Sequence, residues 1–183
     1  MTLHIGMDQI EKKLAEREKI LDGLLGDNRM IVRSCSNAIK AMHARDIEGA
    51  KTYLEEARKG VEKVSVFQDE FPDQLNHILQ EYTEAQIVKA ALESKKVPSI
   101  SELKVPPVPY LNGLLDAIGE LKREMYESLR RGNKQEAQEY FKMMEEIFDE
   151  LLPLRFSNAI LPEFRRKQDS ARHQIEQARG ELL

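Results

Sequence analysis

The sequence predicts an all-α protein, a bundle of about six to seven mostly long helices that pack antiparallel across short turns. Apolar residues recur three and four positions apart along nearly the whole chain, which is the spacing of one buried helix face. No stretch alternates apolar and polar residues as a half-buried strand would. Four of the seven prolines fall within residues 95–109, which leaves long runs free of helix breakers. With 183 residues, the chain is expected to form a single domain, residues 1–183.

The first two helices are predicted from an apolar stripe and an N-cap. The stripe covers residues 10–42 and predicts one long helix, or two nearly collinear helices interrupted by the Gly-Asp-Asn sequence at residues 26–28. Cys35 falls on this stripe, which favours a small core residue. A second helix should begin at Asp46, because aspartate is a good N-cap.

The middle of the chain holds two further helices separated by a connector. Phenylalanine and proline open the third helix, which should cover about residues 71–94. Residues 95–109 are a proline-rich connector with one helical turn at residues 99–103. The fourth helix should run over residues 110–131, and Gly132 suits the left-handed position that follows a helix end.

Two helices complete the bundle. The fifth should start at Asn133 and stop at Pro153, and the last should start at Pro162 and continue to the C-terminus. In the last helix arginines recur every seven residues with an acid four positions after each of the first two. This pattern favours an exposed ladder of ion pairs, with a phosphate-binding track as the alternative. The residues concerned are Arg165, Arg172, Arg179, Asp169 and Glu176.

Composition excludes several classes of protein. Hydrophobic residues make up 41% of the chain and charged residues 33%, and no apolar run approaches the ~20 residues of a membrane-spanning helix. A single cysteine excludes an intramolecular disulfide framework, and no secretory leader opens the sequence, so a cytoplasmic protein is expected. A net charge of −4 argues against a protein that coats nucleic acid through overall basicity, and it leaves room for a local basic patch.

Four carboxylates in two short helical phrases are the candidate site. Glu81 and Glu84 share a face of the third helix, and Asp116 and Glu120 share a face of the fourth, because residues three or four apart are neighbours on a helix. Four hard oxygen donors that converge would suit Mg²⁺ or Mn²⁺. The alternative is a solvated polar face, which is a strong alternative in a chain with 32 acids.

A helical wheel places both acid pairs away from the main apolar stripe of their own helix. The polar side of the third helix carries His77, Glu81, Glu84 and Val88. We interpret His77 as a solvated histidine first, and as a metal ligand or general base second.

Three phrases resemble the translin family, which comprises translin and its nuclease partner, translin-associated factor X. They are QEYTEA at residues 80–85, PYLNGLLDAIGEL at residues 109–121, and RRKQD to ARGE at residues 165–181. The middle phrase is the most specific of the three. The resemblance covers the chain from about Ile31 to its C-terminus.

The resemblance implies which branch of the family the chain is nearest to. The factor X branch keeps four acids at these positions and uses them to hold Mg²⁺ for RNA cleavage, whereas translin has lost them. This chain keeps Glu81, Glu84, Asp116 and Glu120, and so is similar to the catalytic branch in its archaeal single-gene form. Residues 68–73 depart from translin, because they are acidic where translin carries arginines and histidines.

The resemblance therefore implies an Mg²⁺-dependent endoribonuclease, with Mn²⁺ as a possible substitute, that cleaves single-stranded RNA inside a closed shell of identical subunits, an octamer. Single-stranded DNA is a further possible partner. The residues expected to contact nucleic acid are Lys122, Arg123, Arg165, Arg166, Lys167 and His77. Two alternatives stay open: a non-catalytic protein that binds single-stranded RNA or DNA, and a purely structural helical assembly.

Overall fold

A computed structural model of the chain describes residues 6–182, and every regular element within that range is helical. The elements are α1 (Met7–His43), α2 (Ile47–Val64), the 3₁₀ turn η1 (Ser65–Phe67), α3 (Pro72–Leu92), α4 (Ile100–Leu103), α5 (Pro107–Arg130), α6 (Lys134–Leu151) and α7 (Phe164–Glu181). The all-α prediction is confirmed, with α4 as one short helical turn. None of these helices is both long and apolar enough to cross a membrane.

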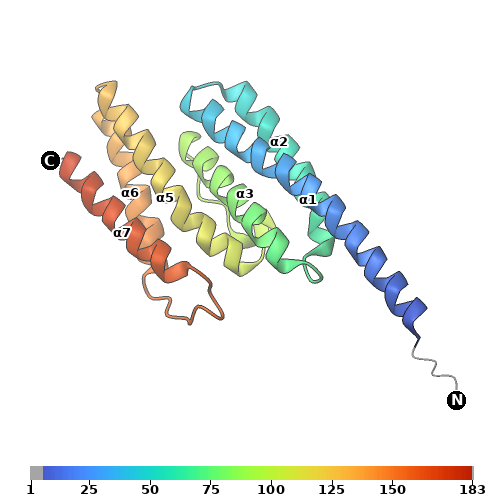
Figure 1. Cartoon of the computed structure of the whole chain (residues 1–183). Coiled ribbons are helices and arrows are strands. Elements are labelled where there is room, and N and C mark those ends of the chain that lie inside the picture. Colours follow the sequence, from blue (N-terminus) through green and yellow to red (C-terminus); the bar gives the residue numbers. More distant parts are fainter. Residues whose placement is uncertain (1–5, 183) are drawn as a thin grey trace, which may run out of the picture.

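The helices lie side by side, with α3 and α5 in the middle of the molecule (Figure 1). On one side α1 and α2 form a hairpin against α3, and on the other side α6 and α7 pack against α5. One hydrophobic core joins α1, α2 and α3, and a second joins α5, α6 and α7 with the end of α3. The interface between α3 and α5 therefore lies between the two cores.

The position of α3 argues against the alternative of a fully solvated polar face. Because α3 packs against α1 on one side and α5 on the other, residues all around it are buried. Val88, which the wheel grouped with the polar residues, is fully buried, and so is Ile87. Glu84 is consequently only partly exposed to solvent.

Local signals located most helix ends correctly. The Asp46 carboxylate accepts a hydrogen bond from the Gly49 amide at 2.9 Å and so caps α2. Ser99 and Glu102 form a capping box around α4. Asn133 caps α6 in the same way as Asp46 caps α2, and Gly132 adopts the left-handed conformation expected after α5, with φ at +77°.

One detail settles an alternative that the sequence left open, and two differ from the sequence expectations. First, α1 runs unbroken through residues 26–28, where the buried Asn28 side chain donates a hydrogen bond to the Gln74 carbonyl at 2.9 Å and ties α1 to α3. Second, α5 begins at Pro107, three residues early, because a first helical turn has no need of the amide hydrogens that proline lacks. Third, α7 begins at Phe164, after Glu163 in the left-handed conformation.

Gly113 brings the backbones of α3 and α5 into close contact. A Cβ atom at this position would lie 2.7 Å from Thr83 Cβ and 2.8 Å from the Gln80 carbonyl oxygen. No side chain larger than hydrogen fits without displacing one of the helices. The glycine of the middle phrase therefore sets the spacing of the two helices that carry the four acids.

Candidate functional site

Three of the four predicted acids meet at one cavity between α3, α5 and the start of α7. Glu81, Glu84 and Asp116 line it, and its volume is about 310 Å³. The other lining residues are Leu115, Arg166, Lys167, Ser170, Ala171 and Gln174. We call this space the acid cavity.

Glu84 is the most perturbed acid of the acid cavity. Burial first, and then the negative charges of Glu81, Asp116 and Glu120, together raise its pKa to about 8. Burial also raises the pKa of Glu81, against the opposing influence of His77. Carboxylates that are partly buried and mutually repulsive gain stability when a cation comes close, so this group of residues favours a positively charged ligand.

Asp116 already has a cation of the protein beside it. The Lys167 ammonium group donates a hydrogen bond to Asp116 Oδ1, and the Gln80 side-chain amide donates one to Asp116 Oδ2 at 2.6 Å. The Lys167 side chain is only 13% exposed. Lys167, which was expected to contact phosphate, thus neutralises an acid of the candidate site.

Glu120 is turned toward α1 instead of the acid cavity. Its Oε2 atom lies 2.5 Å from His43 Nε2, and the other ring nitrogen of His43 contacts Glu124 Oε1. Burial alone would lower the pKa of His43, but the hydrogen bonds of Glu120 and Glu124 outweigh it and raise that pKa to about 9. The histidine in turn lowers the pKa of Glu120. His43 is therefore an imidazolium held between two carboxylates.

A second layer of charges supports this arrangement. Glu124 is 1% exposed, and its Oε2 lies 3.3 Å from a guanidinium nitrogen of Arg45 without accepting a well-aligned hydrogen bond. Arg45 also pairs with Glu136 at 3.1 Å. The sequence alone does not single out His43, Arg45 or Glu124. The one available signal was that Glu124 follows Glu120 at i+4 on α5, which places the two carboxylates on the same helix face.

The donor types suit a hard divalent ion, but the side chains are not in coordinating positions here. All four predicted ligands are carboxylates, as Mg²⁺ and Mn²⁺ prefer. Within residues 6–182, however, no three histidine, cysteine, aspartate or glutamate side chains are arranged to hold a metal ion. Lys167 engages Asp116 and His43 engages Glu120, so rotation of these two carboxylates is needed before four oxygens can converge.

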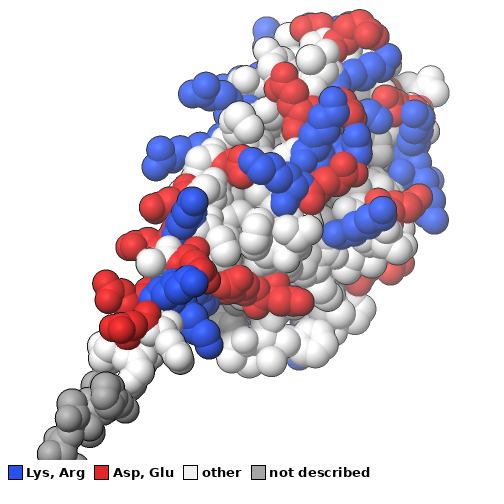
Figure 2. Space-filling view, turned by 90° about the vertical axis from the view of Figure 1, so that its right-hand side faces the viewer, with Lys and Arg blue, Asp and Glu red and all other residues white. Residues whose placement is uncertain are grey.

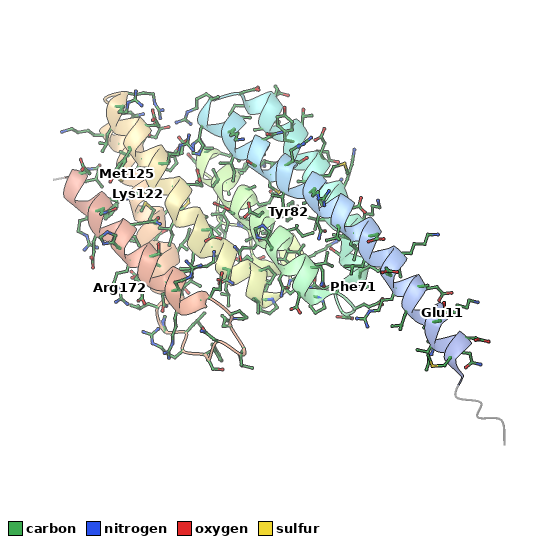
Figure 3. The ribbon with its side chains drawn as sticks, viewed as in Figure 1. Glu11, Phe71, Tyr82, Lys122, Met125 and Arg172 are labelled. Atoms are coloured by element: carbon green, nitrogen blue, oxygen red, sulfur yellow. The ribbon has the colours of Figure 1, made fainter. Side chains whose placement is uncertain are left out.

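The residues expected to bind nucleic acid fall on both sides of the acid cavity. Lys122 and Arg123 line a cavity of about 400 Å³ together with Gln174, which also lines the acid cavity. Lys122 lies on the side of α5 that faces α7, where it contacts the Gln177 side chain at 2.5 Å (Figure 3). On the opposite side, Arg165 and Arg166 line a third cavity of about 880 Å³.

The three cavities adjoin one another because they share residues. Gln174 lines the first and the acid cavity, and Arg166 lines the acid cavity and the third. The basic residues and the acids thus form one track along α5 and α7. His77 lies at its edge, largely exposed, with Nδ1 3.8 Å from Glu81 Oε1.

The arginines of α7 do not form the predicted ion-pair ladder along the helix. Arg179 pairs with Glu145 of α6 at 2.7 Å, and the Arg172 guanidinium lies 6.0 Å from the ring centre of Phe148. Both arginines therefore fasten α7 to α6. Figure 2 shows the face that carries α1, where acidic and basic side chains are interspersed, so this face presents no extended surface of one charge.

Comparison with known proteins agrees with the resemblance seen in the three phrases. Residues 28–178 match the model of the translin family. An uncharacterized protein of Methanocaldococcus jannaschii is 30% identical over 188 residues, which cover 99% of this chain and 84% of that protein. The cavity residues of α3, α5 and α7 all fall within the matched region.

Solved structures share the fold. The structure of an AfC3PO–duplex RNA complex superposes with a TM-score of 0.87 at 27% identity, and covers 96% of this chain and 94% of that one. The crystal structure of apo-NeC3PO superposes with a TM-score of 0.89 over 100% of this chain and 98% of that one, and at 23% identity it bears on the fold alone. The chain belongs to the translin family.

Proposed function

We propose that the chain is a metal-dependent endoribonuclease that uses the acid cavity to cleave single-stranded RNA. The observation that carries this proposal is the continuous track in which a cavity with three carboxylates lies between two cavities with basic residues. An RNA strand whose phosphates bind the basic residues of both outer cavities also contacts the acids between them. The similar AfC3PO structure is a complex with duplex RNA, which supports RNA as the ligand class.

The proposed metal ligands are Glu81, Glu84, Asp116 and Glu120. A bound Mg²⁺ or Mn²⁺ ion would supply a Lewis acid for a phosphate oxygen and a water of lowered pKa. Asp116 and Glu120 would exchange Lys167 and His43 for the ion by rotation of their side chains. Their own cations would remain close enough to orient them.

Two further roles, general base and phosphate binding, complete this proposal. One acid of the site that the ion leaves free is the first candidate for the general base. His77, at the edge of the acid cavity, is the second candidate. Arg166 and Lys122 would bind backbone phosphates on either side of the cleaved bond, which gives salt-sensitive binding with little sequence preference.

The proposal includes a closed assembly of identical subunits. We infer that identical subunits enclose the track in a closed assembly, an octamer, so that a flexible single strand reaches the acids more readily than a stiff duplex. Size-exclusion chromatography with light scattering would give the mass of the assembly. A mass of eight subunits supports the octamer, and a monomer or dimer excludes it.

The test of catalysis is an RNA cleavage assay with Mg²⁺, with Mn²⁺ and with EDTA, on the parent and on Asp116→Asn. Cleavage should require the ion and should fall at least 100-fold in the variant, because both metal binding and charge are lost. The matched control is Glu146→Gln with Glu150→Gln, an exposed pair of acids with helical spacing on α6. An Asp116→Asn protein that cuts as fast as the parent would exclude the assignment.

A non-catalytic binder is the second candidate function. It is favoured by the present positions of Asp116 and Glu120, which are satisfied by Lys167 and His43 without any ion. Such a protein would bind single-stranded RNA or DNA equally well in EDTA and in Mg²⁺ and would cut neither. A structural assembly would bind neither nucleic acid in the same assay.

A further inference from the structure

The third cavity contains more than the two arginines that the sequence singled out. It lies between the start of α7 and the segment that joins α6 to α7, residues 152–163, which projects from one end of the bundle (Figure 1). We call it the loop cavity. Its lining residues are Arg155, Phe156, Ser157, Asn158, Glu163, Arg165, Arg166 and Asp169.

The lining of the loop cavity carries three arginines against two acids. Arg165 makes no ion pair with any residue in the described range, although Asp169 follows it at i+4. Arg166 is 72% exposed, and its one ion pair among the described residues is with Glu163, at 3.3 Å. Arg155 instead stabilises the loop, because its guanidinium group donates hydrogen bonds to the backbone carbonyls of Leu152 and Leu154.

Phe156 is the unexplained side chain of this segment. It is 49% exposed, although a phenylalanine ring gains ~2 kcal/mol from burial. An exposed aromatic ring inside a polar, basic cavity is the arrangement with which proteins bind single-stranded nucleic acid. The ring stacks on a base, and the basic groups hold the backbone.

We propose that the loop cavity is a subsite for one unpaired nucleotide next to the cleaved phosphodiester. Phe156 stacks on its base, Arg165 pairs with a phosphate, and the side chains of Ser157 and Asn158 are hydrogen-bond partners for the base edge. Arg166 lines both the loop cavity and the acid cavity, so the two cavities adjoin. This inference rests on the proposed function, because it takes RNA to be the ligand of the track.

The subsite has a consequence for substrate choice. A base inside a duplex has both faces covered by its neighbours and cannot stack on Phe156, whereas a base in a single strand can. Phe156 would therefore be a residue that discriminates single strands from duplexes. Arginine contacts to phosphate alone would not give this discrimination, since both forms of RNA carry phosphates.

Binding measurements test the subsite without cleavage. All proteins carry Asp116→Asn and are kept in EDTA, and the ligands are a single-stranded RNA with 2-aminopurine and the same strand in a duplex. Phe156→Ala should weaken binding of the single strand by about 5- to 100-fold and leave duplex binding within twofold. It should also abolish the quenching of 2-aminopurine that stacking produces, and Phe156→Trp should preserve both signals.

Ile160→Ala is the matched control, because Ile160 is an exposed apolar residue of the same segment that does not line the loop cavity. It should change neither affinity. The proposal is overturned if Phe156→Ala binds the single strand as tightly as its background, or if it weakens single strand and duplex equally. A change in assembly mass in Phe156→Ala would also overturn it and would show a contact between subunits instead.

The outcome for the subsite is separate from the outcome for catalysis. If Asp116→Asn still cuts RNA at the parent rate, the metal-dependent nuclease fails, while the binding measurements still decide the subsite. If Asp116→Asn is inactive and Phe156→Ala binds normally, only the subsite fails.

Discussion

His43 Nε2 lies 2.5 Å from Glu120 Oε2, and this contact joins the last residue of α1 to the middle of α5. The same ring reaches Glu124 with its other nitrogen. Two carboxylates one helical turn apart on α5 thus share a single imidazolium. The hairpin of α1 and α2 is fastened in this way to the helix that carries half of the candidate site.

Replacing His43 with leucine should destabilise the protein strongly. The substitution leaves Glu124 buried without its partner, and breaking a buried ion pair costs about 3–5 kcal/mol. Urea denaturation measures the free energy of unfolding. The control is His173→Leu, which removes an exposed histidine of α7 and should change stability by less than about 0.5 kcal/mol. A loss below about 1 kcal/mol for His43→Leu would contradict the buried pair.

His43 also gives a pH dependence of known sign. Its pKa is raised from 6.5 to about 9 in the folded protein, so its contribution to stability is fully present below pH 6.5 and is lost as the pH rises through 9. The stability difference between the parent and His43→Leu should therefore shrink across this window. A difference that stays constant from pH 6 to pH 9.5 would show that the histidine is not charged in the folded state.

Glu84 gives a second pH dependence of the stability, over a lower pH range than His43. Its pKa is raised from 4.5 to about 8, so the folded state binds more protons than the unfolded state between these values, and stability falls as the pH rises. Glu84→Gln should gain stability over the parent progressively from pH 4.5 to about 8 and then level off. Thermal unfolding in EDTA across this range gives the difference. Glu150→Gln, an exposed acid of α6, should show no such trend.

Lys167 and Arg165 should behave differently toward RNA, although both are basic residues of α7. Because Lys167 is paired with Asp116, Lys167→Gln leaves an uncompensated aspartate in the track and weakens RNA binding. Asp116→Asn added to it should restore the affinity to near the parent value, measured in EDTA at fixed salt. The same addition should not restore Arg165→Gln. If Asp116→Asn fails to rescue Lys167→Gln, Lys167 binds phosphate directly, as the sequence suggested.

Gly113→Ala tests the close contact of α3 and α5. The new methyl group would overlap Thr83 and the Gln80 carbonyl, and overpacking of this kind costs about 1–3 kcal/mol. Gly26→Ala is the opposite case, because nothing lies within 4 Å of its Cβ position on α1. It should stabilise the protein by about 0.5–1 kcal/mol through helix propensity. Equal effects of the two alanines on the unfolding midpoint would refute the contact.

The sequence predicted what is determined locally. Asp46 and Asn133 begin helices because each caps amides within three residues of itself, and Gly132 ends one because of its own backbone freedom. The pairing of the acids within each helix follows from the same local geometry. These features need no knowledge of distant residues.

What the sequence could not predict depends on which helices meet. The wheel of α3 gave one polar face, but two neighbouring helices cover α3, and Glu84 is therefore enclosed beside other acids. His43 and Glu124 are 81 positions apart, and no local pattern marks them as partners. The contact between Lys167 and Asp116 joins residues 51 positions apart, so no local pattern indicated that Lys167 pairs with an acid.

Asp116 and Glu120 each face a cation that belongs to the chain itself. Small zinc domains, in contrast, are unfolded until their ion arrives. Because Lys167 and His43 neutralise these two acids and two apolar cores hold the helices together, we expect the protein to fold without an ion. In the nuclease that we propose, the divalent ion is an exchangeable component, and activity would follow its free concentration in the surroundings reversibly.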